Sequence, residues 1–231
     1  MLVRDLWHAR LHGIGVVLSL AGLGLLGAAT AGVIHHNPLT QFDVTLLEWL
    51  HARATPTGYV IFNAVSLVGA PRAMTGLALG GSLVLAARRQ WIVLGGWVVA
   101  FAGGRLLSEF LKGLIRRPRP PYAAAFLDHY SWSFPSGHAM GSLIGYGMLA
   151  YLLVVLWTHR RTMQVPIVVG AALLVVAIGL SRLYLGVHYF SDVVGGYAAG
   201  GLWLSACISG LEVARRWGAA PPPAAPSNKA S

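Results

Sequence analysis

Long apolar runs, separated by short polar segments, follow one another along most of the chain. A helix needs about 20 predominantly apolar residues to cross the hydrocarbon core of a bilayer. By this criterion the sequence predicts an all-α fold, an integral membrane bundle of six transmembrane helices. The predicted spans are Gly13–Ile34, a segment within Gly58–Ala87, Trp91–Leu111, Ala139–Trp157, Pro166–Leu180 and Tyr189–Leu211.

The first run has a second possible interpretation, a cleaved signal peptide. Met1–His12 is charged, and Ala29-Thr30-Ala31 resembles a signal-peptidase site. However, the uncharged stretch Gly13–Ile34 exceeds the roughly 7–15 residues of a signal-peptide core. Its length suits a spanning helix, so we expect a retained membrane anchor.

Two polar segments add detail to this pattern. His35–Arg53 mixes leucines and a tryptophan with Asp43 and Glu48, which is typical of a short amphipathic helix at the membrane interface. Gly69-Ala70-Pro71 predicts a break or kink in the second span. The pattern leaves open whether Gly58–Gly69 belongs to this span or forms a separate surface helix.

The composition supports a membrane protein. Hydrophobic residues make up 56% and charged residues only 10% of the 231 residues, whereas a soluble domain has about 25% charged residues. The length allows one membrane domain, residues 1–218, followed by a Pro/Ala-rich cytoplasmic tail, residues 219–231, that we expect to be disordered. A single cysteine, Cys207, excludes an intrachain disulfide.

The charge balance indicates partners and orientation. The net charge of +10 would suggest nucleic acid for a soluble protein; beside apolar spans, we expect membrane lipids and phosphates instead. Arginine pairs fall on one side of the predicted bundle, which is then cytoplasmic by the positive-inside rule. They are Arg88-Arg89, Arg160-Arg161 and Arg215-Arg216, together with Arg4 and Arg10. The opposite, outer face carries three polar clusters.

The first cluster contains Lys112 and Arg119, on a segment that prolines stiffen and that can therefore hold an anion in a fixed place. Arg116 and Arg117, between them, fit simple contacts with lipid headgroups equally well. Upstream of Lys112, an internal Arg105–Glu109 ion pair is the favoured interpretation, because pairing lowers the cost of burying charge. In the same interpretation Lys112 would extend to the interface, but the cations and prolines that follow it favour an anion-binding role.

The second cluster is Ser136-Gly137-His138. Ser136 is well placed as the N-cap of the fourth span. The backbone N–H groups after it would lie at the positive end of the helix, where phosphate binds favourably. Taken alone, a capped helix with an interfacial His138 explains these residues equally well.

The third cluster is Arg182, His188 and Asp192. Asp192 follows His188 by one helical turn, so its carboxylate can reach the imidazole. This pairing raises the basicity of the ring, as a nucleophilic or general-base histidine requires. A structural Asp–His hydrogen bond explains these two residues but not the cations on the same face. No metal is expected, because two histidines and one carboxylate beside several cations are a poor zinc site.

Three motifs in this order resemble those of the type 2 phosphatidic acid phosphatase (PAP2) superfamily of membrane lipid-phosphate phosphatases: Lys112-x6-Arg119-Pro120, Pro135-Ser136-Gly137-His138 and Ser181-Arg182-x5-His188-x3-Asp192. The resemblance implies that His188 attacks phosphorus, that Asp192 orients it, and that His138 protonates the leaving oxygen and then activates water. Five residues would bind the phosphate oxygens: Lys112, Arg119, Ser136, Gly137 and Arg182. The family uses no cofactor for this chemistry.

The resemblance therefore implies metal-independent hydrolysis of a lipid phosphate or diphosphate through a phosphohistidine, on the outer face of a bacterial inner (cytoplasmic) membrane. Expected substrates are undecaprenyl diphosphate, phosphatidic acid and phosphatidylglycerophosphate. The alternative is a lipid phosphotransferase or lipid A phosphatase that uses the same site; a transporter is disfavoured, because binding alone needs no nucleophile. The substrate lipid and the oligomeric state stay open. Two roles also stay open for the aromatic loop Pro121–Ser133: selection of the lipid headgroup, or a plain aromatic belt at the membrane interface.

Overall fold

A computed structural model describes residues 20–35, 38–126, 131–157 and 161–218, and these residues form helices and connecting turns without any strand. The all-α prediction is confirmed. In chain order the helices are Leu20–His35, α2 (Pro38–Ala52), α3 (Pro56–Val68), α4 (Pro71–Ala87), α5 (Trp91–Val98), η1 (Val99–Gly103), α6 (Gly104–Ile115), η2 (Pro121–Phe126), α7 (Gly137–Leu152), η3 (Leu153–Trp157), α8 (Arg161–Tyr184) and α9 (Phe190–Gly218).

Five helical segments in the described part of the chain are long and apolar enough to cross a membrane: Pro56–Ala87, Trp91–Ile115, Gly137–Leu156, Thr162–Tyr184 and Phe190–Trp217. The helix Leu20–His35 is apolar but shorter, and the first residues of the predicted span Gly13–Ile34 lie outside the described ranges. The protein is therefore a multi-pass membrane protein, and the count of six spans stays a prediction. The predicted tail, residues 219–231, also lies outside the described part.

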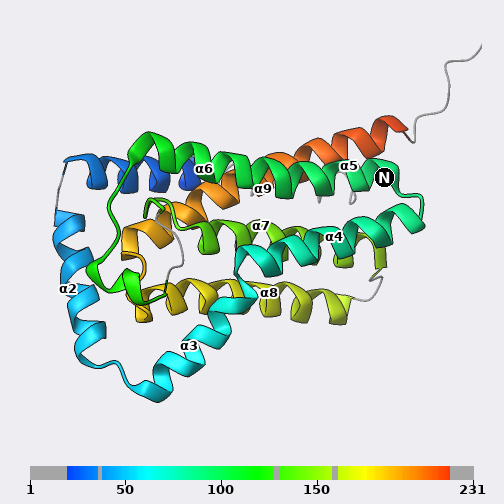
Figure 1. Ribbon diagram of the computed structural model, residues 1–231. Coiled ribbons are helices and arrows are strands. Elements are labelled where there is room, and N and C mark those ends of the chain that lie inside the picture. Colours follow the sequence, from blue (N-terminus) through cyan, green and yellow to red (C-terminus); the bar gives the residue numbers. More distant parts are fainter. Residues whose placement is uncertain (1–19, 36–37, 127–130, 158–160, 219–231) are drawn as a thin grey trace, which may run out of the picture.

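Helix α7 lies at the centre of the bundle, with α9, α8, α4 and α6 packed around it. The segment α5–η1–α6 runs as one long rod beside α9 (Figure 1). At one end of the bundle, α2 and α3 leave the common helix direction. The C-terminal end of α6 and the N-terminal ends of α7 and α9 meet at this same end, which places the three predicted polar clusters together.

The predicted break in the second span is confirmed, since α3 ends at Val68 and α4 begins at Pro71. Thr55 caps α3 by accepting a hydrogen bond from the Gly58 N–H at 3.0 Å. Figure 1 shows α3 diverging from α4, and α3 packs mainly on α8. Gly58–Val68 therefore lies in a helix distinct from α4, and a surface position for this helix stays a prediction.

Helix α2 lies within the segment His35–Arg53, and the amphipathic character predicted for this segment stays a prediction. The Asp43 side chain is buried, as is Leu47 one turn later. The carboxylate therefore has a partner inside the protein, described below. The position of α2 at the membrane interface stays a prediction.

The outer surfaces of the bundle are rich in large apolar side chains. Leu83, Leu106, Phe110 and Leu114 are each more than 60% exposed. Apolar side chains of this size gain from contact with lipid chains, so these surfaces are suited to the bilayer.

Glycines allow α9 to approach the start of α7 closely. A Cβ atom at Gly196 would lie 2.7 Å from the Ser136 carbonyl oxygen and 3.3 Å from the Met140 nitrogen, which are backbone atoms that cannot rotate away. This contact fixes the start of α7 against α9, and with it the relative position of two of the polar clusters.

We expect Gly196→Ala to destabilise the protein by about 1–3 kcal/mol, the cost of overpacking a well-packed interior. Gly210→Ala is the matched control on the same helix, because its Cβ would meet no atom within 4 Å. The control should be neutral or stabilising by about 0.4–1 kcal/mol. Thermal unfolding in detergent compares the two variants, and equal midpoints would contradict the close approach.

Candidate active site

The three predicted clusters converge at one end of the bundle. Arg119 Nη1 lies 3.1 Å from His188 Nε2, which joins the first cluster to the third. Lys112 Nζ lies 3.4 Å from where a Cβ of residue 137 would be, which joins the first to the second. The Ser136 N–H donates to the Asp192 carbonyl at 2.9 Å, which joins the second to the third.

His188 is held between a carboxylate and a guanidinium. Its Nδ1 lies 3.4 Å from Asp192 Oδ2, so the predicted Asp–His pairing is present. Asp192 Oδ2 also accepts hydrogen bonds from the Tyr189 N–H, at 2.9 Å, and from the Ser133 hydroxyl. With Nδ1 directed at the carboxylate, Nε2 is the ring nitrogen that faces Arg119.

The environment keeps His188 neutral. Burial lowers the pKa of His188 to about 3; the hydrogen bond to Asp192 raises it, and the charge of Arg119 lowers it further. An imidazole with this pKa is unprotonated at neutral pH, which leaves a lone pair on one ring nitrogen. A neutral ring is the form in which histidine acts as a nucleophile or base.

The short turn before His188 depends on glycine. Gly186 adopts a left-handed φ of 65°, and the Val187 N–H donates to the Arg182 carbonyl at 3.2 Å. This glycine-dependent helix end reverses the chain between α8 and α9. It brings Arg182 and His188 close enough to interact electrostatically.

Of the three predicted phosphate-binding cations, Lys112 and Arg182 are buried and Arg119 is half-buried. Arg119 donates to the Ser131 carbonyl at 2.7 Å, to the Ser131 hydroxyl at 2.8 Å and to the Val187 carbonyl at 2.9 Å. Lys112 is 7% exposed and lies 3.4 Å from Glu109. The alternative in which Lys112 extends to the membrane interface therefore does not hold, because the packing of α6 on α7 encloses the side chain. The Arg105–Glu109 pair is confirmed at 3.3 Å.

Two predicted binding groups have polar atoms without partners in the described part of the chain. Arg182 donates from Nη1 to the Ser66 hydroxyl on α3, but its Nε has no hydrogen-bond partner. Ser136 is at the N-cap position of α7 as predicted, yet its hydroxyl makes no capping hydrogen bond and has no other partner there. Buried polar atoms of this kind are costly unless a ligand or water uses them.

His138 is in the first turn of α7, as predicted. Its electrostatic interactions are with Arg182, His188, Arg119 and Lys112, so it belongs to the same cluster. The arrangement therefore brings together two histidines, three cations, a free serine hydroxyl and the start of a helix. Such a set can hold a phosphate group and transfer it to an imidazole nitrogen.

A second buried network, which the sequence pattern did not indicate, surrounds Arg117. Its guanidinium donates to Asp192 Oδ1 at 2.7 Å, to Asp43 Oδ2 at 2.8 Å and to the Ser191 hydroxyl at 2.7 Å, and it stacks over Tyr189 at 4.2 Å. The Ser191 N–H also donates to Asp43, at 2.9 Å. The nearby carboxylates raise the pKa of Arg117, although burial opposes this.

The alternative that Arg117 contacts lipid headgroups is therefore wrong, whereas Arg116 is exposed. One signal was available: Asp43 is an acidic residue placed directly between Phe42 and Val44 in the amphipathic segment. Nothing in the local pattern paired it with Arg117, which is 74 residues away.

The described part of the aromatic loop Pro121–Ser133 packs on the protein. Tyr122 stacks on His51 of α2 with ring centroids 3.7 Å apart, and Phe126 stacks on Tyr59 of α3 at 5.7 Å. These contacts hold this part of the loop against α2 and α3. Residues 127–130 lie outside the described ranges.

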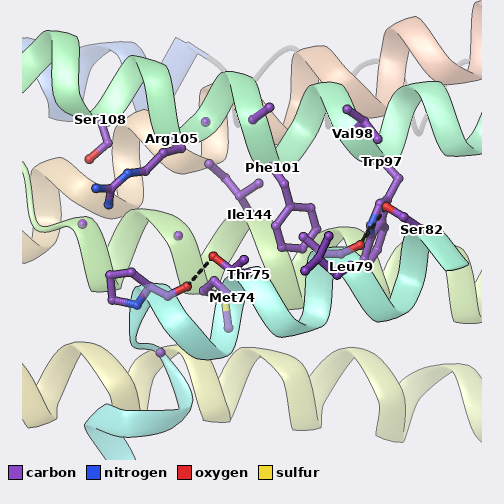
Figure 2. Close-up of a pocket in the computed structure, with 17 residues that line it drawn as sticks. Met74, Thr75, Leu79, Ser82, Trp97, Val98, Phe101, Arg105, Ser108 and Ile144 are labelled. Atoms are coloured by element: carbon purple, nitrogen blue, oxygen red, sulfur yellow. Dashed lines mark hydrogen bonds between the residues drawn. The ribbon is translucent and has the colours of Figure 1, made fainter.

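A largely apolar cavity of about 500 Å³ adjoins the cluster, between α4, the α5–η1–α6 rod and α7. Figure 2 shows Arg105 and Ser108 toward one end, with Phe101, Leu79 and Trp97 toward the other. Gly137 also lines it, so the cavity reaches the predicted phosphate-binding residues. Its far end is closed in part by Trp97, whose Nε1 donates to the Ala78 carbonyl at 2.9 Å.

Among the described residues, no group of three or more His, Cys, Asp or Glu side chains could hold a metal ion. Metal independence itself stays a prediction. Fold and site together define a multi-pass membrane enzyme whose polar cluster suits phosphoryl transfer, with an apolar cavity beside it.

Comparison with known proteins agrees with this class. The sequence profile of the PAP2 superfamily matches residues 93–216, and the chain belongs to this superfamily. It is 30% identical to phosphatidylglycerophosphatase B of Bacillus subtilis over 74% of this chain and 83% of that protein. It is 31% identical to dolichyldiphosphatase of Saccharomyces cerevisiae over 75% of this chain and 72% of that protein.

The fold is also similar to a crystal structure, a transmembrane PAP2-type phosphatidylglycerolphosphate phosphatase from Bacillus subtilis. The TM-score is 0.75 and the sequence identity is 29%, and the superposition covers 88% of this chain and 98% of that chain. Family and relatives identify the protein as a lipid phosphatase.

Proposed function

We propose that the protein removes the terminal phosphate from a membrane lipid through a phosphohistidine on His188. The observation that carries this proposal is the orientation of His188, with Nδ1 at Asp192 and Nε2 at Arg119. A phosphate held by Arg119 would meet the ring at Nε2. Lys112 and Arg182 would balance the charge that develops on its oxygens.

The reaction would have two steps. First, Nε2 of His188 forms a bond to phosphorus as the bond from phosphorus to the lipid oxygen breaks, and His138 gives that oxygen a proton. Then His138 removes a proton from water, the water oxygen bonds to phosphorus, and the P–N bond breaks. Inorganic phosphate leaves and both histidines return to their first state.

Three features support a lipid as substrate. The cavity beside the cluster is mostly apolar and large enough for part of an acyl or prenyl chain. The cluster lies at an end of apolar helices, where a lipid headgroup would be. The relatives act, by their names, on phosphatidylglycerophosphate and on dolichyl diphosphate. Phosphatidylglycerophosphate, phosphatidic acid and undecaprenyl diphosphate are therefore the proposed substrates.

The arginine pairs Arg88-Arg89 and Arg215-Arg216 lie at the opposite end of the bundle from the cluster. Under the positive-inside rule, this supports a proposed site on the outer side of a bacterial inner membrane.

A substrate panel tests the proposal. Purified protein in detergent should release phosphate from at least one of the three lipids, and EDTA should leave the rate unchanged. Loss of activity in EDTA would contradict the metal-independent mechanism, and no release from any of them would contradict the substrate class. Radiolabelled phosphate that appears on an acceptor lipid instead of in solution would indicate phosphotransfer.

A further inference from the structure

Two polar residues of α6 that lie outside the three motifs line the cavity beside the proposed phosphate site. Arg105 and Ser108 are on α6, two turns and one turn before Lys112, and Figure 2 shows both side chains extending from α6 on the cavity side. We infer that they form a second anion subsite, which binds the inner phosphodiester of a lipid that also carries a terminal phosphate monoester. This inference rests on the proposed function.

Ser108 is the first observation. Its side chain is 4% exposed, and its Oγ has no hydrogen-bond partner in the described part of the chain. A serine inside a helix usually donates to a carbonyl one turn before, but Ser108 does not. Its Oγ lies 3.7 Å from where a Cβ of residue 137 would be, on the side where Lys112 Nζ lies at 3.4 Å. The free hydroxyl therefore lies at the boundary between the phosphate cluster and the apolar cavity.

Arg105 is the second observation. Its side chain is 60% exposed although it lines a mostly apolar cavity, and its partner is Glu109, at 3.3 Å. Glu109 also lies 3.4 Å from Lys112, so one carboxylate serves two cations. The side of α6 that carries Arg105 and Lys112 therefore has a net positive charge. A second phosphate can neutralise that charge by replacing Glu109 as the partner of Arg105.

The spacing along α6 favours a particular substrate chemistry. Ser108 is about 6 Å and Arg105 about 10 Å from Lys112 along the helix axis, at 1.5 Å per residue. In a diphosphate the two phosphorus atoms share one oxygen, so the second phosphate stays beside the first. When a short polyol links the two phosphates, the inner one lies several bonds away and toward the lipid chains. The spacing therefore fits the polyol-linked bisphosphate.

The test compares two lipids with identical acyl chains in the same micelles: phosphatidylglycerophosphate, with an inner phosphodiester, and phosphatidic acid, without one. Arg105→Leu should lower the ratio of kcat/KM for the first lipid over the second roughly 10- to 100-fold, the worth of a charge-assisted hydrogen bond. Ser108→Ala should lower the ratio roughly 3- to 10-fold. Arg72→Leu, an exposed arginine on α4 that does not line the cavity, should leave it unchanged.

The variant Glu109→Gln distinguishes a phosphate-binding role of Arg105 from a purely structural Arg105–Glu109 ion pair. A structural Arg105–Glu109 pair predicts that Arg105→Leu and Glu109→Gln have the same effect on both lipids. The subsite predicts instead that Glu109→Gln keeps or raises the preference for phosphatidylglycerophosphate, and that Arg105→Lys restores part of it.

An unchanged ratio in Arg105→Leu and Ser108→Ala would overturn the inference, as would a wild-type enzyme that hydrolyses phosphatidic acid but not phosphatidylglycerophosphate. A wild-type protein that hydrolyses no lipid phosphate would overturn the proposed function itself.

Discussion

His188→Ala should abolish phosphate release, with a loss in kcat of roughly 10⁴-fold or more, because removing a nucleophile stops the covalent route altogether. The lost atom is the Nε2 that faces Arg119, and no other ring nitrogen is paired with Asp192 among the described residues. Phosphate release in detergent, measured on the lipid that the wild type hydrolyses best, gives the rate.

A second measurement makes this prediction specific. Wild-type enzyme that is quenched in alkali after mixing with ³²P-labelled lipid should carry an acid-labile label, as a phosphohistidine does, and His188→Ala should carry none. His35→Ala, an exposed histidine at the end of the first described helix, is the matched control and should keep full activity. Normal turnover in His188→Ala would remove the basis of the proposed mechanism.

Arg117→Leu should destabilise the protein by about 3–5 kcal/mol, the cost of removing one partner from a buried ionic network. Asp43 and Asp192 are 1% and 0% exposed, and both depend on this guanidinium. Without it, two like charges stay buried near each other. Activity should also fall, because Asp192 would no longer be held in position against His188.

Thermal unfolding in detergent measures the effect of Arg117→Leu, and Arg116→Leu is the matched control, because Arg116 is the exposed neighbour. Adding Asp43→Asn to Arg117→Leu should recover part of the lost stability, since it removes one of the unpaired charges. An unfolding midpoint of Arg117→Leu equal to that of the wild type would contradict this account of the network. So would a double variant that loses more stability than the two single variants lose together.

Local features of the site could be predicted from the sequence because they depend on short spacings. Apolar runs of spanning length predicted helices whose cores agree with the structure, and Gly69-Ala70-Pro71 predicted the break between α3 and α4. Asp192 reaches His188 because four residues are one helical turn, whatever the rest of the chain does. The order of the three motifs likewise indicated the PAP2 superfamily.

Contacts between distant segments could not be predicted in this way. Arg117 reaches Asp43 across 74 residues, and Arg182 reaches Ser66 across 116. Each contact depends on how α2 and α3 lie across the end of the bundle, and apolar patterns give helices without fixing which polar side chains meet. The burial of Lys112 and the free hydroxyl of Ser108 have the same origin, the packing of α6 on α7.

The sequence by itself therefore determined the membrane class, the all-helical fold and the candidate site residues, because these follow from composition, helical period and short spacing. Only the tertiary structure decided which nitrogen of His188 faces Arg119, which residues hold Asp192, and which side chains border the cavity. The physical reason is that these properties depend on the angles and distances between helices, which are set by packing over the whole bundle.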